Sequence, residues 1–320
     1  MVDEPVPKPG ATPRVTPAAS ATLSPGAPLL PVPAARVALV GLGLIGGSLA
    51  KATRRAWPGV TILGADRPAI LEVAREAQLV DEIAPLDAAA DLVASADLVV
   101  FCLPVLGIAQ SLERLAPALR ARPVATDTGS TKRLIVETAA RLGLTRFVGG
   151  HPMAGKAQGG LAHADASLFA GARWFLCPAP GVDAAALLLL RQWVRDLGAR
   201  PIELDAAEHD RSVALTSHLP HVVANAIAEA VLDGGALDAA GGSLRDVLKV
   251  AGAPFETWGD TLATNAEAVR GALTDLCARL GAIAASLEDR ERMRDLFARG
   301  RACRERVAGG ERDSAPPERT

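Results

Sequence analysis

From Arg36 onward, short apolar runs alternate with longer stretches in which apolar residues recur at helical spacing. The short runs predict buried strands, at Val37–Val40, Thr61–Ala65, Leu98–Leu103, Pro123–Thr126 and Phe147–Gly149. The longer stretches predict helices, at Leu44–Ala56, Pro68–Ala77, Leu106–Leu119 and Lys132–Leu142. Regular alternation of strands and helices indicates a parallel sheet that is covered by helices.

The pattern changes after about Asp205, where the strand signals stop. Before that point we expect two further strands, at Arg173–Cys177 and Pro201–Leu204, with a helix at Ala184–Leu197 between them. Beyond it we expect only helices, at Ala206–Leu232, Ser243–Ala251, Glu256–Leu280 and Ala282–Val307. The pattern therefore predicts an α/β fold in which a sheet is followed by an all-helical part.

The two ends of the chain lack this periodicity. Residues 1–34 contain nine prolines and almost no apolar pattern, which predicts a disordered tail. Residues 308–320 are expected to be a second unstructured tail.

Composition narrows the function classes. The 34 basic and 36 acidic residues give a net charge of −2, which argues against a nucleic-acid or membrane-surface binder. No apolar run reaches the roughly 20 residues that a membrane helix requires. Four scattered cysteines match neither a metal knuckle nor a redox pair, so we expect a reduced, cytoplasmic protein.

A glycine-rich motif follows the first expected strand and opens a helix, at Gly41-Leu42-Gly43-Leu44-Ile45-Gly46. Gly41 permits the tight turn, Gly43 leaves room for a pyrophosphate, and Gly46 lets helix and strand pack closely. Leu44 and Ile45 stand at the helix N-terminus, whose amides and dipole attract an anion. Residues 35–204 are therefore predicted to form a dinucleotide-binding domain of the Rossmann type.

Asp66 lies 20 residues after the last motif glycine, at the end of the second strand. A carboxylate at this position accepts hydrogen bonds from the adenosine ribose and repels a 2′-phosphate, which favours NAD. The adjacent Arg67 could instead pair with that phosphate, so NADP remains the alternative cofactor.

Two polar segments follow later strands of the sheet. In Asp127-Thr128-Gly129-Ser130-Thr131-Lys132, either Ser130 or Thr131 could contact a ligand or simply cap the next helix. In His151-Pro152-Met153-Ala154-Gly155, the histidine stands at the carboxyl end of a strand and is expected to face the ligand crevice. A histidine there can take a proton from a substrate hydroxyl as hydride leaves the carbon.

The helix that begins at Ala206 carries further candidate residues. One face is expected to hold residues spaced by four, namely His209, Val213, Ser217 and His221. Pro220 removes an amide donor, so the carbonyl of Thr216 is expected to lose its partner and the helix to bend. Zinc at His218 and His221 is rejected because further ligands at suitable spacing are missing, and no metal is predicted.

Taken together, these motifs resemble those of the prephenate dehydrogenase family over roughly residues 36–300. The matching segments are GLGLIGGS at 41–48, DTGSTK at 127–132, GGHPMAG at 149–155, EHD at 208–210 and SHLPH at 217–221. The family joins a dinucleotide domain to a helical dimerisation domain. The resemblance implies that residues 205–307 form this second domain and that the chain is a homodimer.

The resemblance also implies roles for individual residues. His151 matches the catalytic histidine that is bonded to the ring hydroxyl of the substrate, and Ser130 matches a serine that orients that hydroxyl and the nicotinamide. His221 matches a histidine on the substrate side. Supporting residues of the pocket are matched by His218, Ser217, His209 and Asp210. The implied reaction is NAD-dependent oxidative decarboxylation of prephenate to 4-hydroxyphenylpyruvate in tyrosine biosynthesis.

Two departures from the family pattern bear on the substrate. Lys156 follows the HPMAG segment where the family commonly has a threonine–glutamate pair near the substrate side chain. A lysine there disfavours the ammonium of arogenate and favours prephenate. The family's arginine for the ring carboxylate aligns with Lys249, a point charge instead of a fork, and Arg245 lies one helical turn earlier.

Three alternative functions remain open from the sequence. The chain could be an arogenate or dual-substrate cyclohexadienyl dehydrogenase, with NADP as an alternative cofactor. It could be a β-hydroxyacid dehydrogenase with a similar two-domain build, which would leave HPMAG unexplained. It could also be a non-catalytic nucleotide sensor on this scaffold, against which the presence of His151 and Ser130 argues.

Substitution of Asp66 tests the cofactor assignment. Asp66→Ala should weaken NAD binding and improve the relative use of NADP, because it removes both a ribose acceptor and a repulsive charge. Dissociation constants for the two dinucleotides, measured by fluorescence titration, give the selectivity. An unchanged NAD/NADP ratio would remove Asp66 from cofactor recognition.

Overall fold

A computed structural model describes residues 34–120, 122–156 and 158–312. Its centre is an eight-stranded sheet in the order β3-β2-β1-β4-β5-β6-β7-β8. The strands are β1 Arg36–Val40, β2 Thr61–Asp66, β3 Glu82–Pro85, β4 Leu98–Phe101, β5 Val124–Asp127, β6 Phe147–Pro152, β7 Arg173–Pro178 and β8 Arg200–Glu203. The β6–β7 pair is antiparallel, and the other neighbours are parallel. The first six strands thus have the order of a dinucleotide-binding fold.

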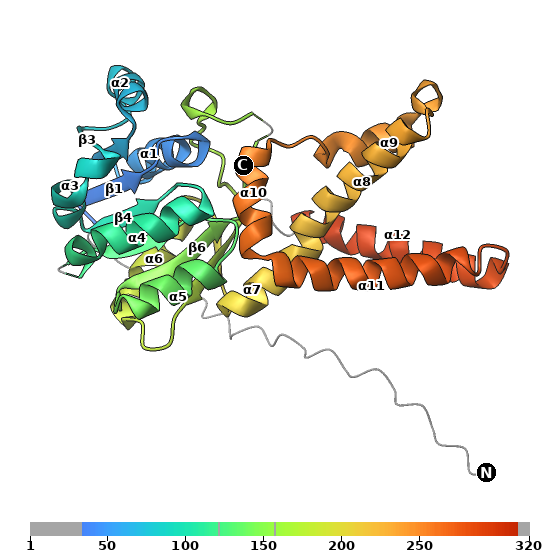
Figure 1. Cartoon of the computed structure of the whole chain (residues 1–320). Coiled ribbons are helices and arrows are strands. Elements are labelled where there is room, and N and C mark those ends of the chain that lie inside the picture. The colour runs from blue at the N-terminus through green and yellow to red at the C-terminus, as the bar shows by residue number, and fades with distance from the viewer. Residues whose placement is uncertain (1–33, 121, 157, 313–320) are drawn as a thin grey trace, which may run out of the picture. The chain divides into compact units, whose positions relative to one another are not determined.

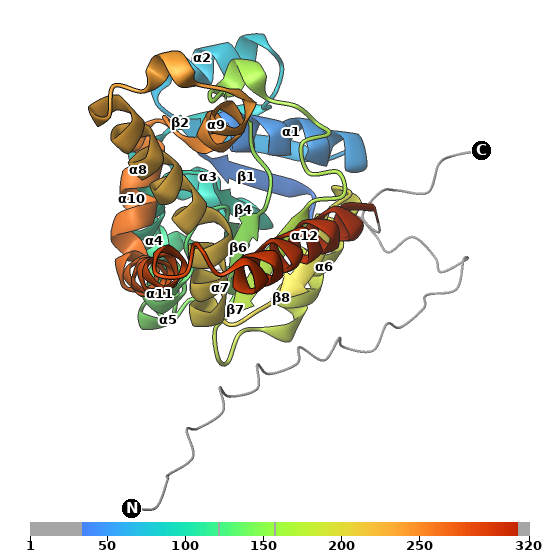
Figure 2. The ribbon, with the colours of Figure 1, turned by 90° about the vertical axis from the view of Figure 1, so that its right-hand side faces the viewer.

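Helices cover both faces of the sheet (Figures 1 and 2). One face packs against α1 Leu44–Ala56, α2 Pro68–Glu76 and α6 Ala184–Asp196. The other packs against α3 Ala90–Ala94, α4 Val105–Leu119 and α5 Arg133–Arg141. Along β1, Val37 and Leu39 join the first core while Ala38 and Val40 join the second. Burial on both faces explains why this strand is continuously apolar.

The predicted α/β fold, a Rossmann-type sheet followed by helices, is confirmed. Two elements of the sheet region were not predicted, β3 (Glu82–Pro85) and α3 (Ala90–Ala94). β3 pairs only with β2, and three of its four residues are exposed. An exposed edge strand needs no run of apolar side chains, so its sequence carries no strand signal.

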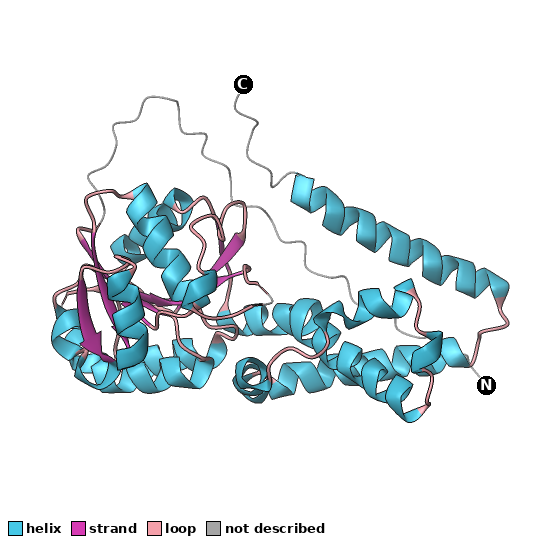
Figure 3. Cartoon of the chain, turned by 90° about the horizontal axis from the view of Figure 1, so that it is seen from above, coloured by secondary structure: helices cyan, strands magenta, loops and turns pink. Residues whose placement is uncertain are grey.

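The rest of the described chain is helical, and Figure 3 shows the strands gathered in one part of the molecule. Its helices are α7 Ala206–Val213, α8 Leu219–Asp233, α9 Gly242–Val247, α10 Phe255–Thr264, α11 Ala266–Ala284 and α12 Arg290–Arg312. α7 contacts α5, and α10 contacts α4 (Figure 1). The division into domains at residues 204 and 205 stays a prediction, because these contacts join the two parts.

Several helix boundaries differ from expectation. The single helix expected at Glu256–Leu280 is split at Asn265, whose side-chain amide bonds the Asp210 carbonyl at 2.8 Å. A turn at 285–289 separates α11 from α12, and the Asp289 carboxylate accepts from the first amides of α12. α12 continues to Arg312, so the expected tail at 308–320 begins as helix. Residues 313–320 and residues 1–33 of the tail expected at 1–34 lie outside the described residues. Ala34, the last residue of that expected tail, is instead buried in the core beside β1.

The disruption expected at Pro220 is a π-helical turn at Ala214–His218, between α7 and α8. Proline has no N–H to give to the preceding turn, so the hydrogen bonds there rearrange. A π turn holds an additional residue, which shifts the buried face by one position. His218, and not Ser217, therefore follows His209 and Val213 into the interior. The prediction of one face with uniform spacing of four was wrong for this reason.

Candidate active site

The glycine-rich loop has the geometry that a dinucleotide requires. Gly41 has a φ of +101°, and a Cβ there would lie 2.6 Å from the Cys102 carbonyl oxygen. A Cβ at Gly46 would lie 1.9 Å from the Gly41 oxygen, whereas one at Gly43 would meet nothing within 4 Å. No side chain caps the N-terminus of α1, which begins at Leu44 and continues with Ile45. Open space in front of uncapped amides suits a pyrophosphate.

Asp66 ends β2 beside this loop and is buried. Its carboxylate oxygens accept from the Leu42 and Arg67 amides, both at 2.6 Å. The carboxylate is therefore fixed against the turn that would hold the phosphates and keeps further acceptor capacity. The Arg67 side chain is exposed, with its Nε 3.8 Å from Asp66 Oδ1.

The two polar segments lie on neighbouring parallel strands, because β5 pairs with β6. Ser130, half-buried, follows β5, and His151 stands near the end of β6. The phosphate loop follows β1, three strands away from β6 in the sheet. Strand spacing places the loop and His151 about 14 Å apart along the carboxyl edge. A dinucleotide lying along this edge would span that separation.

A chain of hydrogen bonds joins three side chains, which we call the histidine relay: Asp210, His209 and His151. His209 Nδ1 lies 2.8 Å from Asp210 Oδ1, and His209 Nε2 lies 2.9 Å from His151 Nδ1. The carboxylate can only accept, so we assign the proton to His209 Nδ1. His209 Nε2 then accepts from His151 Nδ1–H. This network leaves the His151 Nε2 lone pair free to take a proton.

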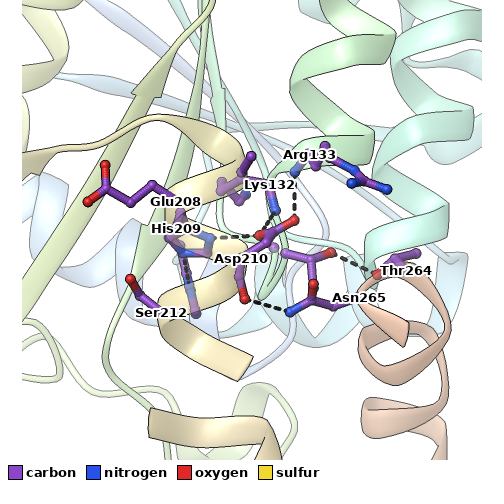
Figure 4. A network of polar contacts seen from close by, with 12 residues as sticks. Lys132, Arg133, Glu208, His209, Asp210, Ser212, Thr264 and Asn265 are labelled. Atoms are coloured by element: carbon purple, nitrogen blue, oxygen red, sulfur yellow. Dashed lines mark hydrogen bonds and ion pairs between the residues drawn. The ribbon is translucent and has the colours of Figure 1, made fainter. Parts of the chain in front are cut away.

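Asp210 also caps a helix of the sheet region (Figure 4). Its Oδ1 accepts from the Lys132 amide at 2.7 Å, and its Oδ2 accepts from the Arg133 amide at 2.9 Å. These two amides open α5, which has no side-chain cap of its own. Capping of α5 by Ser130 or Thr131 was therefore wrong, and the Thr131 hydroxyl instead pairs with the Thr264 hydroxyl at 2.8 Å.

Beneath the relay lies an ion pair that is wholly buried. The Lys132 ammonium bonds the Asp127 carboxylate and, at 2.6 Å, the Gly150 carbonyl. Asp127 also accepts from the Gly129 amide at 2.8 Å and the Gly150 amide at 2.9 Å. Four hydrogen bonds thus compensate the burial of the two charges.

These surroundings change the protonation of the relay. Burial first, and then His209, Lys132 and His218, hold the pKa of His151 well below its ordinary 6.5. Burial alone would raise the pKa of Asp210, but hydrogen bonds from His209 and the Arg133 and Lys132 amides lower it. His151 is therefore neutral near pH 7, and Asp210 is ionised.

Two histidines of the SHLPH segment lie beside Trp258 of α10. The His221 ring lies 3.9 Å from the Trp258 ring between centroids, and the His218 ring lies 5.7 Å away, edge-on. His218 is buried and accepts from the Asn265 amide at 3.2 Å; burial lowers its pKa to about 4. His221 is half-buried and hydrogen-bonds the Val250 backbone, and burial lowers its pKa; its Nδ1 is buried and has no partner among the described residues. Ser217 is also half-buried.

The cations predicted to bind substrate make their contacts elsewhere. Lys156 pairs with Asp165 at 3.0 Å in the loop between β6 and β7. Lys249 pairs with Asp246 at 2.8 Å, and about three quarters of its side chain is exposed. Arg245 is exposed on α9. The segment with Lys249 packs on α8, the helix that carries His221.

Sequence reasoning missed three residues of this region: Lys132, Trp258 and Asn265. Lys132 belongs to a recognised motif, but its burial depends on strands that meet only in the fold. Trp258 carries no motif. Asn265 follows a threonine in the middle of an expected helix, where an asparagine is a weak signal for a helix end.

The described residues contain no group of three or more His, Cys, Asp or Glu side chains that could hold a metal. Within the same ranges, no helix is both long enough and apolar enough to cross a membrane.

Comparisons with known proteins identify the family and agree with the fold. Residues 49–203 match the family model described as prephenate dehydrogenase, nucleotide-binding domain, and residues 205–299 match prephenate dehydrogenase, dimerization domain. A prephenate dehydrogenase from Lactococcus lactis is 31% identical over 80% of this chain and 72% of its own length. A cyclohexadienyl dehydrogenase from Zymomonas mobilis is 33% identical over 76% of this chain and 85% of its own length. The crystal structure of prephenate dehydrogenase from Aquifex aeolicus with hydroxyphenyl propionate and NAD+ superposes with a TM-score of 0.80 at 27% identity, covering 85% of this chain and 98% of that one.

The role of Asp210 can be tested by stability. Asp210→Ala should lower the free energy of unfolding by about 2–4 kcal/mol, because two helix amides lose their cap and a buried histidine loses its partner. The folded pKa of Asp210 lies below the ordinary 3.8, so this contribution is complete above that pH and is lost as the pH falls through the folded pKa.

Urea denaturation at pH 7 and at lower pH provides the measurement. The matched control is Asp205→Ala, because Asp205 caps α7 from an exposed position and accepts from the Ala207 and Glu208 amides. Its loss should cost about 1 kcal/mol. Equal losses for the two variants would contradict a special role for Asp210.

Proposed function

This chain belongs to the prephenate dehydrogenase family, and we propose that it catalyses the NAD-dependent oxidative decarboxylation of prephenate to 4-hydroxyphenylpyruvate. The observation that carries this proposal is the His151 imidazole, held through Nδ1 by the histidine relay at the carboxyl edge of a dinucleotide-binding sheet, with no partner for Nε2 among the described residues. A neutral imidazole in that place suits removal of a proton from a hydroxyl beside a hydride acceptor.

NAD is the expected cofactor. The open space at Gly43 and the uncapped start of α1 would receive its pyrophosphate, and the Asp66 carboxylate would accept from its ribose. When bound, NAD supplies the acceptor for the hydride that leaves the carbinol carbon. Burial of Asp66 next to the loop supports NAD over NADP, whereas Arg67 is free to reorient because it is exposed.

We assign the acid–base work to His151, with Ser130 orienting the ring hydroxyl. The hydroxyl proton passes to His151 Nε2 as hydride departs, which leaves a carbonyl on the ring. The bond to the quaternary carboxylate then breaks, carbon dioxide leaves, and its electron pair makes the ring aromatic. The phenolate oxygen recovers the proton from His151, so the histidine is regenerated. General acid–base help of this kind contributes about 10²–10⁴-fold.

The substrate carboxylates are proposed to meet the SHLPH segment and nearby cations. His221, which is half-buried beside Trp258, is the first candidate, and His218 and Ser217 support it. Lys249 or Arg245 would provide the positive charge for the ring carboxylate, after Lys249 exchanges its pairing with Asp246.

Lys156 would disfavour the ammonium of arogenate, although Asp165 offsets part of its charge. The similarity to a cyclohexadienyl dehydrogenase makes arogenate the alternative substrate. The cytoplasmic location expected from the sequence stays a prediction.

We also propose a homodimer that forms through the helical part. α12 is exposed over nearly all of its described length, and Phe297 and Val307 are 74% and 63% exposed. On α11 and the turn after it, Leu280 and Leu287 are more than half exposed. Apolar surface of this extent on one part of a chain favours a partner subunit.

The dimer proposal predicts a mass of twice the single chain in light scattering at micromolar concentration. Phe297→Glu should shift the protein toward monomer, because it places a charge in an apolar interface. Val73→Glu is the matched control, since Val73 is half exposed on α2 of the sheet region. A monomeric wild type, or equal effects of the two substitutions, would count against this interface.

The function is tested by following NADH formation with prephenate and with arogenate as separate substrates. Wild type should reduce NAD with prephenate, and His151→Asn should lower kcat by about two to four orders of magnitude while retaining NAD affinity. Activity with arogenate alone would transfer the proposal to the alternative substrate. Near-normal turnover by the variant would remove His151 from the chemistry.

A further inference from the structure

Lys132 is a lysine with no exposed side-chain surface. Lysine is almost never fully buried unless it is paired, since removal of its charge from water is costly. Its ammonium has two partners, the Asp127 carboxylate and the Gly150 carbonyl at 2.6 Å. Only the second partner is a neutral group, and it is the carbonyl of the peptide that joins Gly150 to His151.

These contacts connect β5 and β6 beyond the last residue pair of their backbone ladder. The paired residues of β5 and β6 are Ala125 with Phe147 and Thr126 with Val148, so the ladder ends before Gly150. Beyond that point, the Gly150 amide donates to Asp127 Oδ1 at 2.9 Å, and its carbonyl accepts from Lys132. The ion pair therefore holds the backbone before His151 through two hydrogen bonds, one from the Gly150 amide and one to the Gly150 carbonyl.

Close packing around Gly150 restricts movement of its backbone. A Cβ at this position would lie 2.4 Å from the Asp127 carbonyl oxygen and 2.6 Å from Thr126 Oγ1. The strand end thus lies in direct contact with β5. A small movement of Lys132 would change the peptide plane that aims the His151 ring.

We propose that Lys132 is a positioning residue for His151, which fixes the preceding peptide and places a buried positive charge beside the relay. The inference rests on the proposed function, because it assigns Lys132 to the same proton transfer. It extends that function because it gives a charged residue outside the histidine relay a role in positioning the base.

Other charged and titratable groups face His151 from several elements. Lys132 approaches from the start of α5, His209 and Asp210 from α7, His218 from the π-helical turn, and Asp127 from β5. Both carboxylates are engaged, Asp127 by Lys132 and two amides, and Asp210 by His209 and two amides. Of the two charges in the ion pair, Lys132 and not Asp127 acts on His151, so a proton on His151 would meet a repulsion from Lys132.

The variants are Lys132→Met and the double variant Asp127→Asn/Lys132→Met. The single variant leaves Asp127 buried without its counter-ion, which can prevent folding, whereas the double variant removes both charges. Arg146→Met is the matched control, because Arg146 pairs with Asp183 at 2.7 Å and directly precedes β6, at the end remote from His151.

Two measurements separate positioning from a merely structural role. The first is the pH dependence of kcat/KM with prephenate and NAD, whose acid limb reports protonation of the base in the free enzyme. The second is a histidine NMR titration of the protein without substrate. The chain has only five histidines, and His151→Asn identifies the resonance of interest.

Removal of the charge should raise the pKa of His151 toward its ordinary value. We expect both the acid limb and the NMR titration to move to higher pH by on the order of one pH unit in the folded double variant. Arg146→Met should move neither. A purely structural lysine would lower stability and leave both pH values unchanged, and that result would overturn the proposal.

Failure of the proposed function would look different. In that case wild type would reduce NAD with neither prephenate nor arogenate, while the NMR titration would still report the effect of Lys132 on His151. An unshifted His151 titration in the double variant would overturn the inference about Lys132, whichever substrate the enzyme uses.

Discussion

The carboxylate of Asp210 is the constraint on which the candidate site depends. It accepts from the two amides that open α5 and from the ring of His209, and it is 4% exposed. One side chain of the helical part therefore fixes the loop after β5 and, through His209, the ring of His151. Because the carboxylate only accepts, it also sets which nitrogen carries each proton along the relay. Asp210 therefore sets the orientation and the tautomers of the relay.

The relay is surrounded by groups that disfavour an additional positive charge. Lys132 and three histidines lie in one region, and the nearby carboxylates are already engaged. A neutral imidazole is the form that can accept a proton, so these surroundings keep His151 in the form that acts as a base. The cost of burying the ion pair and the relay is met by hydrogen bonds on nearly every polar atom. Removal of one member should therefore disturb several others.

The contact between sheet and helices also explains the interruptions in the helical part. Asn265 leaves helical geometry to bond the Asp210 carbonyl and His218, which ends α10. The π-helical turn before Pro220 rotates His218 inward beside it. Both irregularities bring polar groups to the place where two parts of the chain meet. Irregular backbone is concentrated where function is expected.

Apart from β3 and α3, the sequence by itself determined the strands of the sheet and the helices between them, the phosphate loop and the two segments that carry Ser130 and His151. Those features follow from local periodicity and from motifs whose geometry is built within a few residues. Tertiary structure alone decided that Asp210 caps α5, that Lys132 is buried and that Asn265 ends α10 to bond the Asp210 carbonyl. Each of these depends on groups from segments far apart in the chain, so local periodicity contains no signal for them. β3 was not predicted for a different reason. It is an exposed edge strand that needs few buried neighbours to form, so its sequence has no apolar strand pattern.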